Sequence, residues 1–86
     1  MNNEQMNYER AKIFLDKKIV VHISKKDGIY YNGFIVEVEP NCFFINDKED
    51  GRQLVFFEEL VKPIQEFKEA IEWNLKQKQK LFYGNG

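Results

Sequence analysis

The sequence predicts a mainly β protein, a small bent barrel of five strands with one helix before it and an extended helix after it. Five short apolar segments, separated by turn residues, follow one another between residues 19 and 64. The second segment contains Gly33, and a glycine inside a strand marks a sharp bend, a bulge or a close backbone approach. A barrel this small has to turn corners, which a glycine or a bulge permits.

Composition and charge limit the classes of function. The chain has 86 residues, enough for one domain, and 43% of them are hydrophobic, as in ordinary globular proteins. The net charge of −1 excludes a global attraction to polyanions, so any nucleic-acid contact has to be a local patch. Cys42 is the only cysteine, which excludes an intrachain disulfide and fits a reducing compartment. The chain shows no signal-peptide pattern and no apolar run of membrane-spanning length, so we expect a cytoplasmic protein outside the membrane.

The N-terminal segment predicts a short helix over residues 8–15. Tyr8, Ala11 and Phe14 lie at helical spacing, and Asn7 is a candidate N-terminal cap. Because so short a helix is marginal alone, we expect it to pack on the barrel.

The first two strands are predicted to form a hairpin. Residues 19–24 alternate as a strand does, and Gly28 closes the following turn with a positive φ angle. The second strand covers residues 29–39, in which Ile35 and Val38 stand at positions of opposite parity. Since these two side chains cannot both face inward on a flat strand, we expect a bend or a bulge.

Three shorter strands complete the predicted barrel. Residues 42–45 are a very apolar third strand, and residues 53–57 form the fourth after a polar loop. Residues 60–64 form the fifth strand, which Pro63 interrupts because proline cannot donate to a ladder.

The C-terminal part predicts a helix over residues 65–83, so we divide the chain into a barrel domain, residues 1–64, and a helix with a frayed tail, residues 65–86. The helix has two nearly opposite apolar stripes. We expect the longer stripe to pack on the chain's own barrel and the other to face a neighbouring subunit or a partner protein. The longer stripe consists of Ile64, Phe67, Ile71, Leu75 and Phe82, and the other of Ala70, Trp73 and Leu81.

Catalytic and metal-binding patterns are missing from the sequence. It contains no nucleophile elbow, P-loop, zinc-protease motif or paired-carboxylate signature. His22 has no second histidine or cysteine nearby in the sequence, and Cys42 lies in an apolar run that predicts a buried, inert thiol. We therefore expect no enzyme activity, no catalytic residue, no metal and no cofactor.

Residues 8–64 resemble the Sm/LSm family, with the spacing of its bacterial Hfq branch. The layout alone fits the Sm-like barrel and other SH3-like barrels equally. Sm-like domains begin with a short helix, and their second strand carries a glycine with apolar residues two and five positions later, as Gly33, Ile35 and Val38 do here. An acidic residue and a short apolar strand follow, and the Hfq fourth strand begins as Gln53-Leu54-Val55-Phe56 does here.

The resemblance implies an RNA-binding protein that assembles into a homo-oligomeric ring and acts in RNA processing or metabolism. In this family the fourth strand of one subunit pairs with the fifth of the next. The turn between the second and third strands contributes to a uridine site in this family. We further expect the polar loop after the third strand to supply local cations for single-stranded RNA. The candidate RNA-binding residues are therefore Asn41, Phe43, Lys48 and Arg52. The candidate oligomer-interface residues are Val55, Phe57, Leu60, Val61, Trp73 and Leu81.

A second hypothesis is an Sm-like or SH3-like module for protein interaction or assembly, without RNA. Phe57-Glu58 stands where the family carries an Arg-Gly or Lys-His pair, and a glutamate repels a phosphate path. The near-neutral charge and the second stripe of the C-terminal helix also favour a protein partner.

Overall fold

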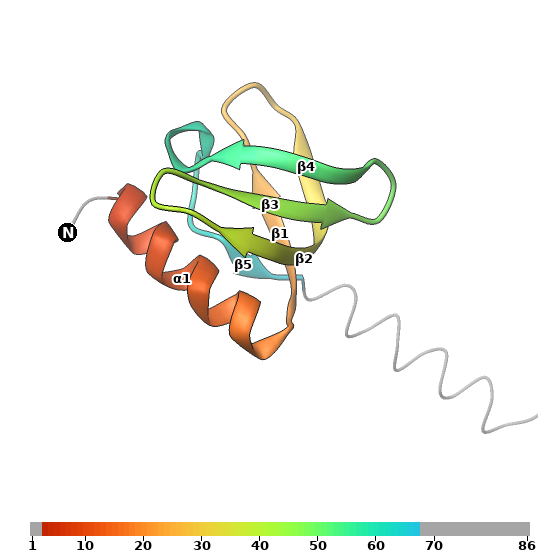
Figure 1. Ribbon diagram of the computed structural model, residues 1–86. Helices are drawn as coiled ribbons and strands as arrows, with labels where there is room; N and C mark the ends of the chain where they lie inside the picture. The colour runs from red at the N-terminus through yellow and green to blue at the C-terminus, as the bar shows by residue number, and fades with distance from the viewer. Residues whose placement is uncertain (1–2, 68–86) are drawn as a thin grey trace, which may run out of the picture.

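The computed structural model describes residues 3–67, in which one helix packs on a bent, five-stranded antiparallel sheet. The strand order is β4-β3-β2-β1-β5 (Figure 1). The predicted architecture, an N-terminal helix followed by five strands, is confirmed. The predicted C-terminal helix lies outside the described residues from residue 68 onward. The elements are α1 (Asn3–Lys17), β1 (Val20–Ser24), β2 (Tyr30–Val38), β3 (Cys42–Asp47), β4 (Gly51–Phe56), the 3-10 helix η1 (Phe57–Glu59) and β5 (Gln65–Glu66).

The core lies between the inner face of the bent sheet and α1. Antiparallel strands alternate their side chains, so one set of positions on each strand points inward. Ala11 of α1 packs against this core and is 0% exposed. The buried residues of the sheet and its connections are Val21, Ile23, Ile35, Phe43, Ile45, Val55, Phe57, Leu60 and Ile64.

The helix is longer than predicted, and Asn7 lies within it rather than at its N-terminus. The Asn7 side chain is 2% exposed, and its Oδ1 accepts a hydrogen bond from the Ile64 N–H at 2.9 Å. Arg10 Nε donates to the carbonyl of the same residue at 2.7 Å. The prediction of a cap was wrong because a residue 57 positions away, invisible to local pattern, takes the Asn7 side chain.

The bend of β2 uses a close backbone approach and a bulge at two different places. A Cβ at Gly33 would overlap the backbone carbonyl of Asn46 on β3. The register between β2 and β3 shifts between Ile35 and Glu37. The shift is a β-bulge, which places one extra residue on β2. Because of this extra residue, Ile35 and Val38 both face inward, as their opposite parity in the sequence required.

The fifth strand differs from the prediction. Of residues 60–64, only Leu60 forms a bridge, to Lys25, and the ladder to β1 begins at Gln65. Pro63 cannot donate to a ladder, so pairing resumes beyond it. Residues 65 and 66, predicted as helix, are therefore strand, and the fourth strand ends one residue earlier than predicted because Phe57 opens η1.

Candidate functional site

The four predicted RNA-binding residues do not form one site. Phe43 is fully buried and packs on Phe57 at 5.2 Å between ring centroids, so it cannot stack on a base. Asn41 and Lys48 are exposed but flank β3 at opposite ends, about 23 Å apart at about 3.3 Å per residue. Arg52 is exposed and lies 3.1 Å from a carboxylate oxygen of Glu37. Of the four, Lys48 alone is among the residues that line the groove described below.

The predicted interface residues divide by burial. Val55, Phe57 and Leu60 are only 0%, 3% and 8% exposed in the chain's own core, so their side chains are not available to a neighbour. Val61 is 59% exposed. The two predicted interface residues of the C-terminal helix lie beyond the described range.

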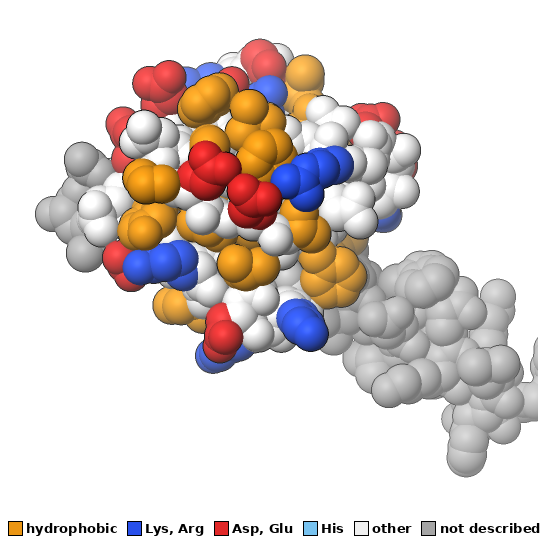
Figure 2. Space-filling view, in the orientation of Figure 1, with side chains coloured by type: hydrophobic (Ala, Val, Ile, Leu, Met, Phe, Trp, Pro, Cys, Tyr) orange, Lys and Arg blue, Asp and Glu red, His pale blue; other side chains and the backbone are white. Residues whose placement is uncertain are grey.

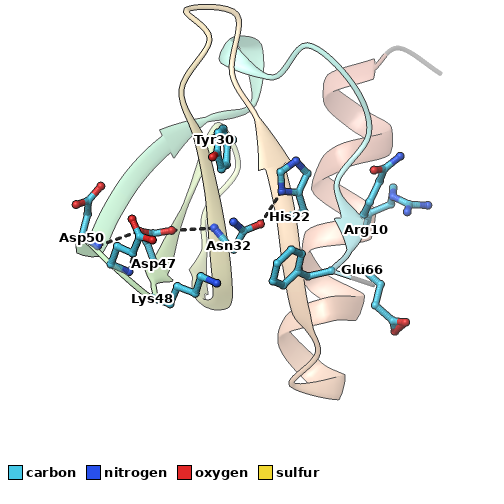
Figure 3. A pocket seen from close by; sticks show the side chains of 11 residues that line it. Arg10, His22, Tyr30, Asn32, Asp47, Lys48, Asp50 and Glu66 are labelled. Atoms are coloured by element: carbon cyan, nitrogen blue, oxygen red, sulfur yellow. Dashed lines mark hydrogen bonds between the residues drawn. The ribbon is translucent and has the colours of Figure 1, made fainter. Parts of the chain in front are cut away.

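A groove of about 850 Å³ opens on the outer face of β1 and β2, beside β5 and the turn that follows β3 (Figure 3). It lies where five separate parts of the chain meet, so no single motif describes it. The residues that line it are Arg10 from α1, His22 from β1, Tyr30 and Asn32 from β2, Asp47 to Asp50 at the end of β3 and in its turn, and Gln65, Glu66 and Phe67.

Three aromatic rings form one wall of this groove. The His22 ring stacks on Phe67 at 6.2 Å between centroids with an interplanar angle of 21°. Tyr30 lies 5.6 Å from His22 in a tilted arrangement and is 62% exposed. Lys48 places its Nζ 5.3 Å from the centre of the Phe67 ring. The wall therefore offers three neighbouring aromatic rings beside a cation.

The orientation of His22 is set by a hydrogen bond from within the sheet. Its Nδ1 donates to Asn32 Oδ1 at 2.6 Å, since an amide oxygen can only accept. Asn32 is 9% exposed and stands directly opposite His22 in the β1–β2 register. His22 Nε2 lies 3.3 Å from Ser24 Oγ. Asn32 is thus a positioning residue, because its hydrogen bond holds the His22 ring where it stacks on Phe67.

Asp47 shapes the end of the groove through the backbone. Its carboxylate accepts three backbone hydrogen bonds, from Asn32 at 2.8 Å, Glu49 at 3.1 Å and Asp50 at 2.9 Å. Burial raises the pKa of Asp47, but these donors, aided by the charge of Lys48, outweigh burial and hold the pKa below its ordinary value. The Asp47 carboxylate therefore stabilises the backbone of the turn that follows β3.

The charges around the groove are mixed. Arg10 and Lys48 are its cations, while Glu49, Asp50 and Glu66 also border it (Figure 3). Such a surface offers a few phosphate contacts and no broad positive field. What the groove can do chemically is to stack a flat ring and pair one or two anionic groups.

Sequence reasoning missed most of this site, although part of the signal was present. The predicted hairpin is confirmed, with Gly28 at a φ of 89° and the Lys25 N–H donating to the Ile29 carbonyl. That closure sets the register that places His22 opposite Asn32 on the outer face. Counting outward from the turn would have found this pair. No local pattern indicated Arg10 or Phe67.

The surroundings of Cys42 are those of an unreactive thiol. Cys42 is 8% exposed, and burial together with the nearby Glu39 carboxylate raises the pKa of its thiol. No group of three or more His, Cys, Asp or Glu side chains among residues 3–67 is placed to hold a metal ion. Within the same range, α1 is too short and too polar to cross a membrane.

The fold is similar to that of a solved structure, the crystal structure of the pleiotropic translational regulator Hfq. The two superpose with a TM-score of 0.57 and 14% sequence identity, covering 66% of this chain and 92% of that one. No family model matches the chain, and no curated protein matches it in sequence. At this identity the likeness shows the Sm-like fold alone.

Proposed function

We propose that this chain forms a homo-oligomeric ring that binds single-stranded RNA through the aromatic groove and acts in RNA processing or metabolism in the cytoplasm. The observation that carries the proposal is the aromatic wall of His22, Tyr30 and Phe67 beside Lys48. In proteins that bind single strands, stacking of a base on an aromatic side chain contributes about 1–3 kcal/mol.

Stacking, rather than charge, would supply most of the affinity. The chain has a net charge of −1, and Arg10 and Lys48 are the only cations that border the groove in the described residues. For single strands, the slope of log K against log salt is about −0.7 for each phosphate contact, so two contacts give about −1.4. We expect this shallow slope rather than the steep dependence of a basic protein.

Two unpaired sheet edges support self-assembly. Within residues 3–67, β4 pairs only with β3, and β5 pairs only with β1. Edge strands present unpaired N–H and C=O groups, and pairing β4 of one copy with β5 of the next satisfies both edges. Repeated around an axis, this head-to-tail contact closes into a ring. The exposed Val61, just before β5, adds an apolar contact.

The test measures binding of fluorescein-labelled oligo-uridine and oligo-adenine by anisotropy at low salt. Tyr30→Ala should weaken binding of the preferred RNA about 5- to 150-fold, the equivalent of about 1–3 kcal/mol. Tyr30→Phe keeps the ring and should bind as the natural chain does. Because Tyr30 is 62% exposed, neither change should unfold the protein.

A lysine pair provides the matched control for charge. Lys48→Gln should weaken binding and flatten the salt slope, whereas Lys26→Gln, an exposed lysine outside the groove, should change neither. Equal effects of the two substitutions, or no binding of either RNA at low salt, would remove the groove as an RNA site. Light scattering on the same samples tests the ring, which a monomer at micromolar concentration would contradict.

A second candidate function is the assembly module without RNA. The acidic residues Glu49, Asp50 and Glu66 at the groove favour it, because they oppose a phosphate backbone. Under this alternative, light scattering would show an oligomer while both RNA probes stay unbound.

A further inference from the structure

The outer face of β2, β3 and β4 carries an apolar surface that the groove does not use. We call it the outer apolar face and define it by Phe34, Val36, Phe44, Leu54 and Phe56. Four of these are 41–45% exposed, and Phe44 stands directly opposite Leu54 in the β3–β4 register. Figure 2 shows hydrophobic side chains gathered over β3 and β4, between acidic and basic groups. A contiguous surface of this kind marks a contact rather than idle surface.

We propose that residues 68–86 of a neighbouring copy cover the outer apolar face, with Trp73 and Leu81 as the apolar anchors. This inference rests on the proposed ring. Three observations select this occupant over an unrelated partner: the composition of the segment, its charge, and the place from which it leaves the sheet.

The composition and charge of the segment complement the face. Residues 68–86 contain seven hydrophobic residues, four lysines and two glutamates, a net charge of +2. The whole chain carries −1, so residues 1–67 carry −3. Glu37 and Glu39 border the outer apolar face, next to Arg52 and Cys42 respectively. An apolar segment with lysines therefore meets an apolar surface edged by carboxylates.

The starting point of the segment favours a neighbouring copy over its own chain. The Phe67 N–H donates to the Val20 carbonyl at 2.9 Å, so the segment leaves the sheet at the β5 edge. In the same chain, Leu54 and Phe56 lie on β4. Strand β4 is four strand spacings from β5, about 19 Å along the sheet at about 4.8 Å per spacing. In the proposed ring, β4 of the next copy lies one spacing from β5, about 4.8 Å. Residue 68 therefore starts beside the neighbour's face.

The experiment uses Trp73, the only tryptophan of the chain, as the reporter in the full-length protein. The face variant carries Leu54→Ser and Phe56→Ser. Its tryptophan emission should move to longer wavelength, and acrylamide should quench it more strongly than in the natural chain. The control variant carries Ile13→Ser and Ile29→Ser, which are 51% and 46% exposed and lie off the face, and should leave both signals unchanged.

A mixing experiment separates a neighbouring copy from the same chain. The face variant is refolded together with a Trp73→Phe chain, whose outer apolar face is intact and which contributes no tryptophan signal. If the segment crosses between copies, Trp73 of the face variant finds the intact face, and its emission returns toward shorter wavelength. If the emission stays where the face variant alone has it, the crossing between copies is wrong.

The native mass of each sample keeps this inference separate from the proposed function. A monomeric natural chain overturns the ring and, with it, the crossing between copies. A ring whose tryptophan emission is the same in the natural chain and the face variant overturns this inference alone.

Discussion

The two faces of the sheet belong to the same strands but carry different kinds of side chain. The inner face is apolar and closed: Val21, Ile23 and Ile45 are 0–1% exposed and belong to one core cluster with Ala11 of α1. One position along β1, the outer face carries His22, which meets Tyr30 and Phe67. Because strand side chains alternate, a single step in sequence moves a residue from the packed face to the binding face.

The outer face is itself divided into two regions. Near β5 it holds the polar and aromatic groove, and over β3 and β4 it holds the outer apolar face. The inner face tolerates only residues that fill it, while the outer face places groups that a ligand or a neighbour can reach. Substitutions that separate these roles test the comparison.

The largest effect is expected at Phe43, which belongs to the inner face. Phe43→Ala should lower the free energy of unfolding by about 3–5 kcal/mol, because it leaves a cavity in the core. Leu54→Ala on the outer face should lower it by less, because Leu54 is 44% exposed within its own chain. Urea denaturation at one protein concentration gives both values. Equal losses would mean that the two faces are not distinct in packing.

The next effect concerns the close approach of β2 and β3. Gly33→Val should cost about 2–4 kcal/mol, because the new Cβ meets the backbone of Asn46, which cannot rotate away. Phe34→Val, one position on and 45% exposed within its own chain, is the matched control and should cost less than Gly33→Val. Thermal melting compares them. A Gly33→Val protein that melts with the natural chain would show that the sheet does not need this contact.

The smallest effect concerns Asp47, where the groove meets the sheet. The folded pKa of Asp47 lies below the ordinary value of an aspartate, so ionised Asp47 stabilises the fold above that ordinary value, and the stabilisation is lost as pH falls through the folded pKa. Asp47→Asn should cost about 1–3 kcal/mol at pH 7. Its stability should then fall less between about pH 5 and pH 2 than that of the natural chain.

The control for this pH dependence is Asp50→Asn, in the same turn. Asp50 is exposed, and its backbone N–H, rather than its side chain, contacts Asp47. The substitution should therefore leave the acid limb of the stability curve unchanged. Denaturant midpoints across the pH range measure both variants. Parallel curves for Asp47→Asn and the natural chain would mean that another group carries the acid sensitivity.

The sequence by itself determined the first four strands and the first turn. Alternation gave the strands, Gly28 marked the hairpin, and the parity of Ile35 and Val38 required the bulge that the structure places between Ile35 and Glu37. These features follow from steric rules that act over a few residues, so they can be seen in local pattern. For the same reason the prediction of a helix from residue 65 was wrong for residues 65 and 66, where pairing depends on the edge that β1 leaves open.

Only the tertiary structure decided which residues share a site. Asn7 looked like a helix cap, but it binds the backbone of Ile64, and Phe43 matched a family position but fills the core. The groove brings Arg10 and Phe67 to one place from opposite ends of the described chain. Such neighbours are set by strand order and by the bend of the sheet. Both depend on packing between distant segments, and no window of the sequence contains that information.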